Sequence, residues 1–177
     1  AGAAAARRQA THRGLPGDDS AGDINVGAAA GHNGNGNGVI QGAWNETDPA
    51  AAGNGNEAVF FWEHVRLGNF AAGPTDFSSV AAANASLPTN ADGERIGISG
   101  VMPITTMNGG SYYVCSDGID GKFARQLDLT MDDGKSNSGS MMAIAQASGT
   151  TQALGPVASP AAANYADGTR YTVCMTY

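Results

Sequence analysis

The stretch WEHVRLGNFAAG, residues 62–73, decides how we interpret this chain, because it completes the clearest helix pattern in the sequence. A helix over residues 57–69 is predicted, since apolar residues recur at i, i+3, i+4 and i+7 at Ala58, Phe61, Trp62 and Val65. Phe60 and Leu67 lie on the opposite side of this helix. A helix that is apolar on two sides is usually packed between two layers. We therefore expect a sheet against one side and another helix, from this chain or a neighbouring one, against the other.

The composition is that of an acidic domain. A length of 177 residues suits a single domain, so we predict one domain over residues 1–177. The net charge is −7, and Lys122 and Lys135 are the only lysines. Arg7 and Arg8 form the one basic cluster. Because a nucleic-acid-binding surface needs clustered Lys and Arg, we expect no nucleic-acid partner.

Two cysteines, Cys115 and Cys174, each lie in a short apolar run typical of a β-strand. They are too few and too far apart for a structural zinc site. In an exported protein we would expect them to form a disulfide. Closing a loop of about 60 residues would stabilise the fold by about 4 kcal/mol. The alternative is a pair of buried free thiols.

The N-terminal part of the chain predicts helix and loop. Residues 1–12 are rich in alanine and predict a helix, which Gly14 and Pro16 end. Residues 17–57 lack periodicity and predict a large surface loop with one apolar contact at Val39 and Ile40. A helical turn is expected around residues 77–83.

The C-terminal half predicts a sheet and a second helix. This helix is capped by Asp120 and ended by Gly134, and its apolar stripe comprises Ile119, Phe123, Ala124, Leu127 and Met131. Strands are predicted at residues 96–104, 111–115, 141–147 and 170–175. Short connections favour antiparallel pairing. We therefore predict an α+β fold, in which an N-terminal helix packs on an antiparallel sheet of about four strands.

Three acidic residues crowd the predicted end of the second helix: Asp128, Asp132 and Asp133. Asp128 and Asp132 share one helix face. Negative charge is unfavourable at a helix C-terminus, so a neighbouring Arg125 or Lys135, or a bound cation, should compensate it. A solvated acidic turn and a cation site are both compatible with the sequence.

No catalytic constellation is visible. The chain has no Gly-x-Ser-x-Gly nucleophile elbow. His64 is interpreted as a packed helix histidine, because the other two histidines, His12 and His32, lie in or beside loops. We therefore expect no enzymatic activity, and a small secreted hydrolase is an alternative without residues to support it.

Four spaced motifs occur in order along the chain. They are the turn LPGD at residues 15–18, the run GNGNGVI at residues 34–40, the WEHVRL segment at residues 62–67, and the acidic turn from Asp128 to Gly134. Together they resemble the head of a type IV pilin or a related pseudopilin, over roughly residues 5–145. In such heads the glycine-rich run usually carries an aspartate where this chain has asparagine. The two cysteines also look like the pilin disulfide.

The resemblance implies a structural subunit rather than an enzyme. Such a subunit assembles with itself and with other pilin-like subunits, into a type IV pilus on the bacterial cell surface or a periplasmic pseudopilus that serves type II secretion. Before assembly it is anchored in the inner membrane. Some pseudopilins bind calcium in the head, which supports a calcium site at Asp128, Asp132 and Asp133. The packing and assembly residues would be Phe60, Phe61, Trp62, Val65 and Leu67.

The chain departs from the family at its beginning. Pilins start with a hydrophobic helix that has a glutamate at its fifth position, and this helix is missing from the sequence. The resemblance implies that residues 1–13 are the remnant of that helix and that residues 14–177 are the head. The alanine-rich start is alternatively an expression remnant. A second hypothesis is a minor-pilin or adhesin-like module that recognises a surface ligand through its loops.

Overall fold

The computed structural model describes residues 14–107, 109–146, 154–161 and 163–177. The helix predicted over residues 1–12, and its packing on a sheet, lie outside the described residues. The described residues form two compact units. The helical unit comprises residues 14–42 and 46–88, and the sheet unit comprises Ala43–Asn45 and Thr89–Tyr177. That residues 1–177 form one domain stays a prediction.

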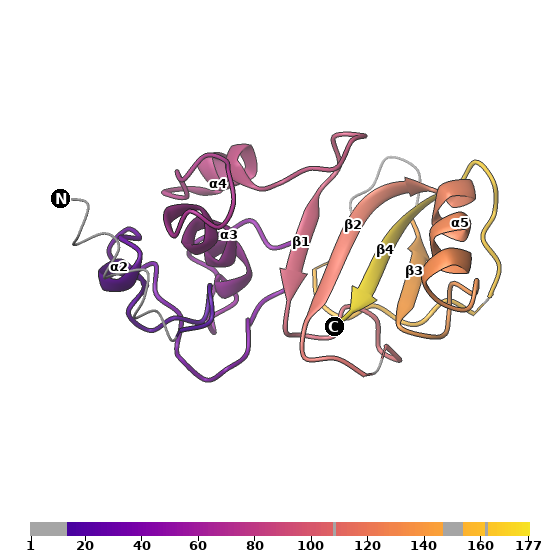
Figure 1. Ribbon diagram of the computed structural model, residues 1–177, viewed down its shortest axis with the longest axis horizontal. Helices are drawn as coiled ribbons and strands as arrows, with labels where there is room; N and C mark the ends of the chain where they lie inside the picture. The colour runs from indigo at the N-terminus through magenta and orange to yellow at the C-terminus, as the bar shows by residue number, and fades with distance from the viewer. Residues whose placement is uncertain (1–13, 108, 147–153, 162) are drawn as a thin grey trace. The chain divides into compact units, whose positions relative to one another are not determined.

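The helical unit contains three helices (Figure 1): α2, Gly22–Asn25; α3, Glu57–Leu67; and α4, Val80–Ser86. Helix α3 is the predicted one, and it is two residues shorter at its C-terminal end than the sequence pattern indicated. The side chain of Asn56, which precedes α3, does not cap it. It donates instead to the carbonyl of Pro49 at 3.0 Å.

Helices α3 and α4 share a small apolar core. Val59 of α3 packs with Ala83 of α4 and with Phe77 and Leu87, which flank α4. The hydroxyl of Ser79 accepts a hydrogen bond from the Ala82 amide at 3.2 Å and caps α4. The guanidinium of Arg66 is buried and donates to the carbonyls of Pro74 and Ser86. These contacts fasten the segment between α3 and α4.

The sheet unit is built on four antiparallel strands in the order β1-β2-β4-β3. The strands are β1, Ile96–Ser99; β2, Tyr113–Asp120; β3, Met141–Ala145; and β4, Arg170–Thr176. This confirms the expected antiparallel sheet of about four strands and a mixed content of helix and sheet. Only the last two strands match their predicted ranges closely, since β1 stops before Gly100 and β2 continues to Asp120.

Alternation along the strands gives the sheet two apolar faces. One face carries Met141, Ala143, Tyr171 and Val173 and is covered by α5, Gly121–Met131. The other face carries Tyr113, Met142 and the two cysteines, and is covered by Trp44, Ile104 and Met107. Cys115 and Cys174 lie opposite each other on β2 and β4 and form a disulfide across 59 residues of sequence. The predicted pairing of the cysteines is therefore present in the fold.

The side chain of Asp120 caps helix α5, as predicted. Most of the predicted apolar stripe, however, faces solvent instead of the sheet. Phe123, Leu127 and Met131 are exposed, whereas Ala124 and Asp128 face inward. The inner side of the helix carries small residues: Ala124 is fully buried with Met141 and Tyr171 of the sheet. A side chain at Gly121 would lie 2.2 Å from the Ala166 carbonyl oxygen and 2.9 Å from the ring of Tyr171. The large side chains lie on the outer side of the helix and are exposed.

Candidate functional site

Three of the four motifs that carry the family resemblance meet in the helical unit. The turn at residues 15–18 lies directly against the glycine-rich run. A Cβ atom at Gly34 would lie 2.4 Å from the carbonyl oxygen of Gly17 and 2.3 Å from the Cα atom of Asp18. Only glycine permits this approach of two backbones. Asn35 and Gly36 then continue the run beside the same turn.

Asp18 binds the glycine-rich run through its carboxylate. One oxygen accepts from the amides of Gly36 at 2.8 Å and Asn37 at 3.0 Å. The other oxygen accepts from the amide of Gly38 at 2.7 Å. Successive amides around one anion form a concave binding site for negative charge. Here the anion comes from the protein itself, and Asp18 is almost fully buried.

Glu57, the first residue of α3, holds the two ends of the same run. Its carboxylate accepts from the amide of Asn35 at 3.0 Å and from that of Gln41 at 2.8 Å. The side chain is fully buried. Burial raises the pKa of Glu57, and the nearby charge of Asp18 adds to the rise, while the two amide donors oppose it. Val39 and Ile40 were predicted to make an apolar contact. The side chain of Ile40 is fully buried, whereas that of Val39 is partly exposed, so only Ile40 is buried as predicted.

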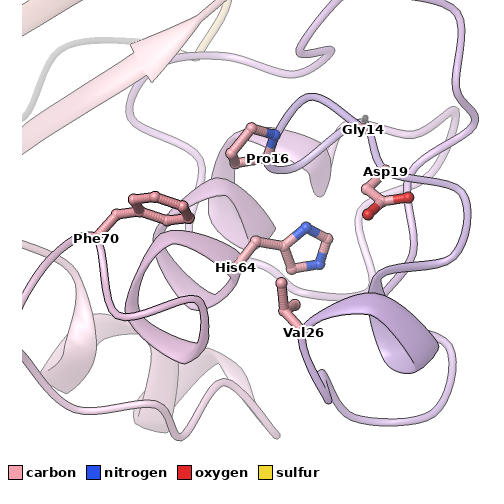
Figure 2. Close-up of a pocket in the computed structure, with 6 residues that line it drawn as sticks. All are labelled: Gly14, Pro16, Asp19, Val26, His64 and Phe70. Carbon is pink, nitrogen blue, oxygen red and sulfur yellow. The ribbon is translucent and has the colours of Figure 1, made fainter. Parts of the chain in front are cut away.

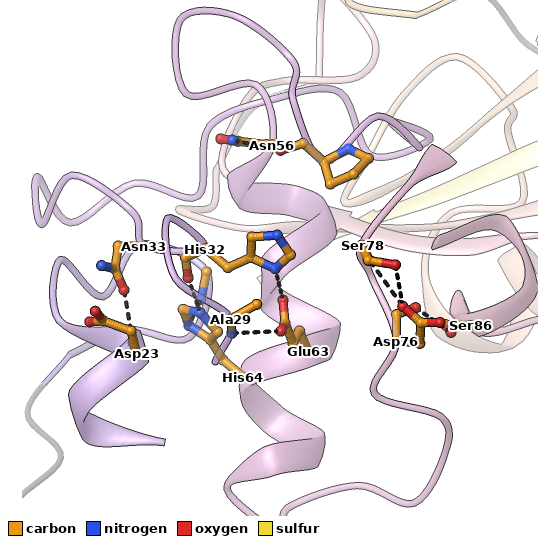
Figure 3. Close-up of polar contacts among 12 residues, drawn as sticks. Asp23, Ala29, His32, Asn33, Asn56, Glu63, His64, Asp76, Ser78 and Ser86 are labelled. Carbon is orange, nitrogen blue, oxygen red and sulfur yellow. Dashed lines mark hydrogen bonds and ion pairs between the residues drawn. The ribbon is translucent and has the colours of Figure 1, made fainter. Parts of the chain in front are cut away.

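His64 fastens α3 to the Leu-Pro-Gly-Asp turn. Its Nδ1 accepts from the Gly17 amide at 3.0 Å, and its Nε2 lies 2.8 Å from the His32 carbonyl (Figure 3). A ring that accepts at Nδ1 and donates at Nε2 is neutral. Burial lowers the pKa of His64, which favours this neutral form. The prediction of a packed helix histidine is confirmed.

Glu63 completes these contacts on the neighbouring side of α3. Its carboxylate lies 2.6 Å from Nδ1 of His32 and accepts from the Ala29 amide at 3.3 Å (Figure 3). The ring of His32 stacks on Phe60 with the ring centroids 4.5 Å apart. Four buried side chains therefore hold the segments before α3 against one another and against the helix. We call this set the loop brace: Asp18, Glu57, Glu63 and His64.

The members of the loop brace bond mainly to backbone groups. A catalytic carboxylate or imidazole must direct a proton-transferring atom at a substrate, whereas these atoms already hold the protein's own amides and carbonyls. The sequence patterns missed the brace, because the apolar spacing that predicted α3 assigns no role to Glu57 or Glu63. The available signal was their spacing with His64 on the side of α3 that faces the glycine-rich loop.

The predicted packing residues of α3 are buried to different degrees. Phe60 is fully buried and Val65 is nearly so, whereas Phe61, Trp62 and Leu67 are each half-buried. Phe60 therefore has no surface to offer a neighbouring subunit, because His32 covers it. The ring of Phe61 contacts that of Trp62 edge to face at 5.1 Å. A role for Phe61, Trp62 or Leu67 in assembly stays a prediction.

The acidic residues predicted to hold a cation come together in the sheet unit. The ligand atoms of Asp128, Asp132 and Asp133 lie within 4.8 Å of one another. Asp128 is buried and accepts from the Tyr165 hydroxyl at 2.5 Å and the Gly134 amide at 2.8 Å. Asp132 accepts from the Met141 amide at 2.9 Å. The three carboxylates thus organise the chain between α5 and β3.

The carboxylates of this turn differ in the direction of their pKa shifts. Burial raises the pKa of Asp128, and the charges of Asp132 and Asp133 add to the rise. The pKa of Asp133 is lowered, because its carboxylate accepts from the Ser138 hydroxyl at 2.6 Å and from the Lys135 amide. Three oxygen donors suit a hard cation such as calcium, which takes six to eight oxygen ligands. Carbonyls or water would have to supply the rest.

The helical unit also contains a hollow of about 140 Å³ (Figure 2). Its wall is apolar at Pro16, Val26 and Phe70, and it includes the side chains of Asp19 and His64. Phe70 is 72 % exposed and stands at its rim. We call this feature the Phe70 hollow. The hollow borders the brace residue His64. Unlike the surroundings of the brace, its wall is mostly apolar and partly open to solvent.

Comparison of the chain with models of protein families, with curated proteins and with solved structures found no match. Among the described residues, no helix is long and apolar enough to cross a membrane.

Proposed function

We propose that this chain is the head of a pilin-like structural subunit that assembles into a filament. The observation that carries the proposal is the loop brace. Three motifs that are separate in sequence become one hydrogen-bonded unit, in which Asp18 and Glu57 hold the glycine-rich run and His64 holds the turn. This arrangement gives each of these three motifs a structural role. It also leaves these polar groups little capacity for chemistry, which favours a structural protein over an enzyme.

The proposal places the head outside the cytoplasm. Cys115 and Cys174 form a disulfide, and such bonds persist mainly in exported proteins. The subunit would be anchored in the inner membrane by a hydrophobic helix before assembly. Its destination would be an extracellular pilus at the bacterial surface or a periplasmic pseudopilus that serves secretion. Its partners would be copies of itself and other pilin-like subunits.

Calcium is the cofactor that we propose for the acidic turn. Asp128, Asp132 and Asp133 supply hard oxygen donors within a short distance, and calcium is the cation that such donors favour. Burial is the main cause that raises the pKa of Asp128, and the charges of Asp133 and Asp132 add to it. A bound cation would offset the part that comes from these neighbouring charges. Calcium would fix the chain between α5 and β3.

A minor pilin or adhesin-like module is the alternative function. The Phe70 hollow favours it, because an open apolar concavity with a few polar groups is the usual form of a ligand site. A surface ligand would then occupy the hollow. Loss of ligand binding in a Phe70→Ala variant, with filament assembly unchanged, would support this alternative.

The filament proposal is tested by the coding sequence upstream of Ala1 and by assembly. We expect an apolar run of about 20 residues with a glutamate near its start. Expression of that longer chain in cells with a pilus assembly apparatus should give filaments that an antibody against this head decorates in electron micrographs. An upstream sequence without the apolar run would refute the proposal.

A further inference from the structure

Three polar side chains from neighbouring strands meet on one face of the sheet. Asp117 is in β2, Thr172 is in β4, and Gln146 directly follows β3; these strands are adjacent in the order β2-β4-β3 (Figure 1). Alternation along β2 and β4 puts Asp117 and Thr172 on the face that carries the disulfide. The backbone amide of Gln146 donates to the Arg170 carbonyl at 2.8 Å, so Gln146 lies diagonally opposite Thr172. We call these three residues the Asp117 cluster: Asp117, Gln146 and Thr172.

One oxygen of Asp117 contacts both of the other side chains. Its Oδ1 accepts a hydrogen bond from the Thr172 hydroxyl at 2.5 Å and another from the side-chain nitrogen Nε2 of Gln146. Two groups that donate to the same oxygen lie no farther apart than two hydrogen-bond lengths, about 6 Å. The side-chain carbonyl carbon of Gln146 is bonded to Nε2. Rotation of this side chain therefore brings that carbon to an attacking distance of about 3.5 Å from the Thr172 oxygen.

The reacting groups of the Asp117 cluster are shielded from solvent. Asp117 is 4 % exposed and Thr172 is 2 % exposed. Burial raises the pKa of Asp117 and the charge of Glu94 adds to the rise, whereas the hydrogen bond from Thr172 and the charge of Arg95 oppose it. A carboxylate with a raised pKa is a stronger base. A substrate in solution could not reach so deeply buried a hydroxyl, so the acyl group that Thr172 attacks has to come from the protein itself.

We propose that Thr172 and Gln146 form an intramolecular ester bond, with Asp117 as the general base. The hydroxyl oxygen of Thr172 attacks the side-chain carbonyl carbon of Gln146, and Asp117 takes the hydroxyl proton. The bond from this carbon to Nε2 then breaks, and Asp117 passes the proton to the leaving nitrogen, which departs as ammonia. One C–O bond forms and one C–N bond breaks, without an oxidant or a cofactor.

The hydrogen bonds of Asp117 suit both proton transfers. The oxygen that receives the proton already binds the hydroxyl that loses it and the nitrogen that gains it. A hydroxyl beside a general base is the usual form of an activated nucleophile, and holding it next to the acyl group makes the reaction unimolecular. Burial then protects the ester from water. The reaction occurs once in each chain, so it is a self-modification and not an enzymatic turnover.

The ester would extend the covalent cross-linking of the sheet. The disulfide joins β2 to β4, and the ester would join β4 to the residue after β3 on the same face. The three strands would then be connected by two side-chain bonds in addition to their backbone ladders. This inference is independent of the proposed filament function.

Peptide mapping of the unmodified chain tests the ester directly. Trypsin cuts after Arg170 and so separates Gln146, in the peptide over residues 136–170, from Thr172, in the peptide over residues 171–177. After denaturation, reduction of the disulfide and alkylation, the two peptides should remain joined. Their combined mass should be lower than the sum of the free peptides by one ammonia in place of the water that joins no other peptides. Hydroxylamine cleaves esters and should separate the pair, whereas an amide cross-link would survive.

Substitutions separate the chemistry from the fold. Thr172→Val keeps the shape of the side chain and removes the nucleophile, so the joined pair should be absent, whereas Thr172→Ser keeps a hydroxyl and should restore it. Asp117→Ala removes the base. Because general base catalysis contributes about 100-fold or more, most of this variant should stay unlinked. Thr130→Val is the matched control, since the Thr130 hydroxyl is exposed and donates to the Gln126 backbone carbonyl; it should be linked like the unmodified chain.

Circular dichroism would verify that the variants are folded, and the unmodified chain decides the proposal by itself. Two free peptides from that chain, after prolonged incubation at neutral pH, would overturn it. Loss of ammonia confined to a single peptide, as a succinimide at an Asn-Gly pair would give, would refute the ester. A joined pair that survives hydroxylamine or persists in Thr172→Val would also refute it. The filament proposal is unaffected by these results, because the upstream sequence and assembly test it separately.

Discussion

Replacing Asp18 by asparagine probes the loop brace with a change of almost no volume. An amide presents one acceptor and one donor where the carboxylate has two acceptors. If the amide nitrogen faces Gly38, one backbone donor meets another donor where a 2.7 Å hydrogen bond had been. If the side chain flips, the nitrogen faces Gly36 and Asn37 instead. Either orientation therefore loses at least one hydrogen bond to a charged group.

The cost follows from the burial of Asp18 and the number of donors. A buried hydrogen bond to a charged group contributes about 1.5–3 kcal/mol. The Gly36 amide also contacts the backbone carbonyl of Asp18, and the Asn37 amide also contacts the Asn35 side chain, so their loss is partly offset. We therefore expect Asp18→Asn to lower the free energy of unfolding by about 2 kcal/mol. In a chain of this size this is roughly 4–8 °C in Tm.

Thermal denaturation and amide hydrogen exchange together measure this effect. Exchange at the amides of Gly36, Asn37 and Gly38 should accelerate in Asp18→Asn, while exchange in β2 and β4 stays unchanged. Asp92→Asn is the control, because it removes the same charge from an exposed position. If Asp18→Asn and Asp92→Asn have the same Tm and the same exchange at the three amides, the carboxylate does not hold the glycine-rich run.

The remaining predictions concern pH, the disulfide and calcium. Because the folded pKa of His64 lies below the ordinary value of 6.5, its contribution to stability is complete above about pH 6.5 and is lost as pH falls through the folded pKa. The protection factor of the Gly17 amide should fall with it, and protection that is independent of pH would contradict the neutral histidine. Reducing the bond between Cys115 and Cys174, which are 59 residues apart, should destabilise the fold by about 4 kcal/mol. A chain in which both cysteines are alanine serves as the control, since reductant should leave its Tm unchanged; equal sensitivity of the two chains would exclude the disulfide as the cause. Calcium at a hundredfold excess over its Kd should stabilise the protein by about 2.7 kcal/mol, and Asp132→Asn should remove most of this gain. An unchanged Tm of the unmodified chain in excess chelator would exclude a calcium site.

Local patterns in the sequence predicted the elements whose formation depends on neighbouring residues. The spacing of apolar residues predicted α3, and the cap at Asp120 predicted the start of α5. Asn56 is of a residue type that often caps helices, but it does not cap α3, because its side chain donates to the carbonyl of Pro49 instead. Short apolar runs predicted the strands that carry the two cysteines, although β2 continues to Asp120, five residues beyond its predicted end. Strand limits depend on where a partner strand ends, and this is not a local property.

The order of the motifs and the positions of the cysteines are properties that the sequence by itself determined. Tertiary structure decided which polar residues are buried and which apolar residues are exposed. Glu57 and His64 are buried because backbone groups from residues 16 to 47 positions away satisfy them, and a helical pattern contains no record of such distant partners. Phe123 is exposed, whereas Ala124 of the same helix is fully buried with Met141 and Tyr171 of the sheet. The hydrophobic effect favours burying a large side chain, but close packing leaves space on that face only for small ones.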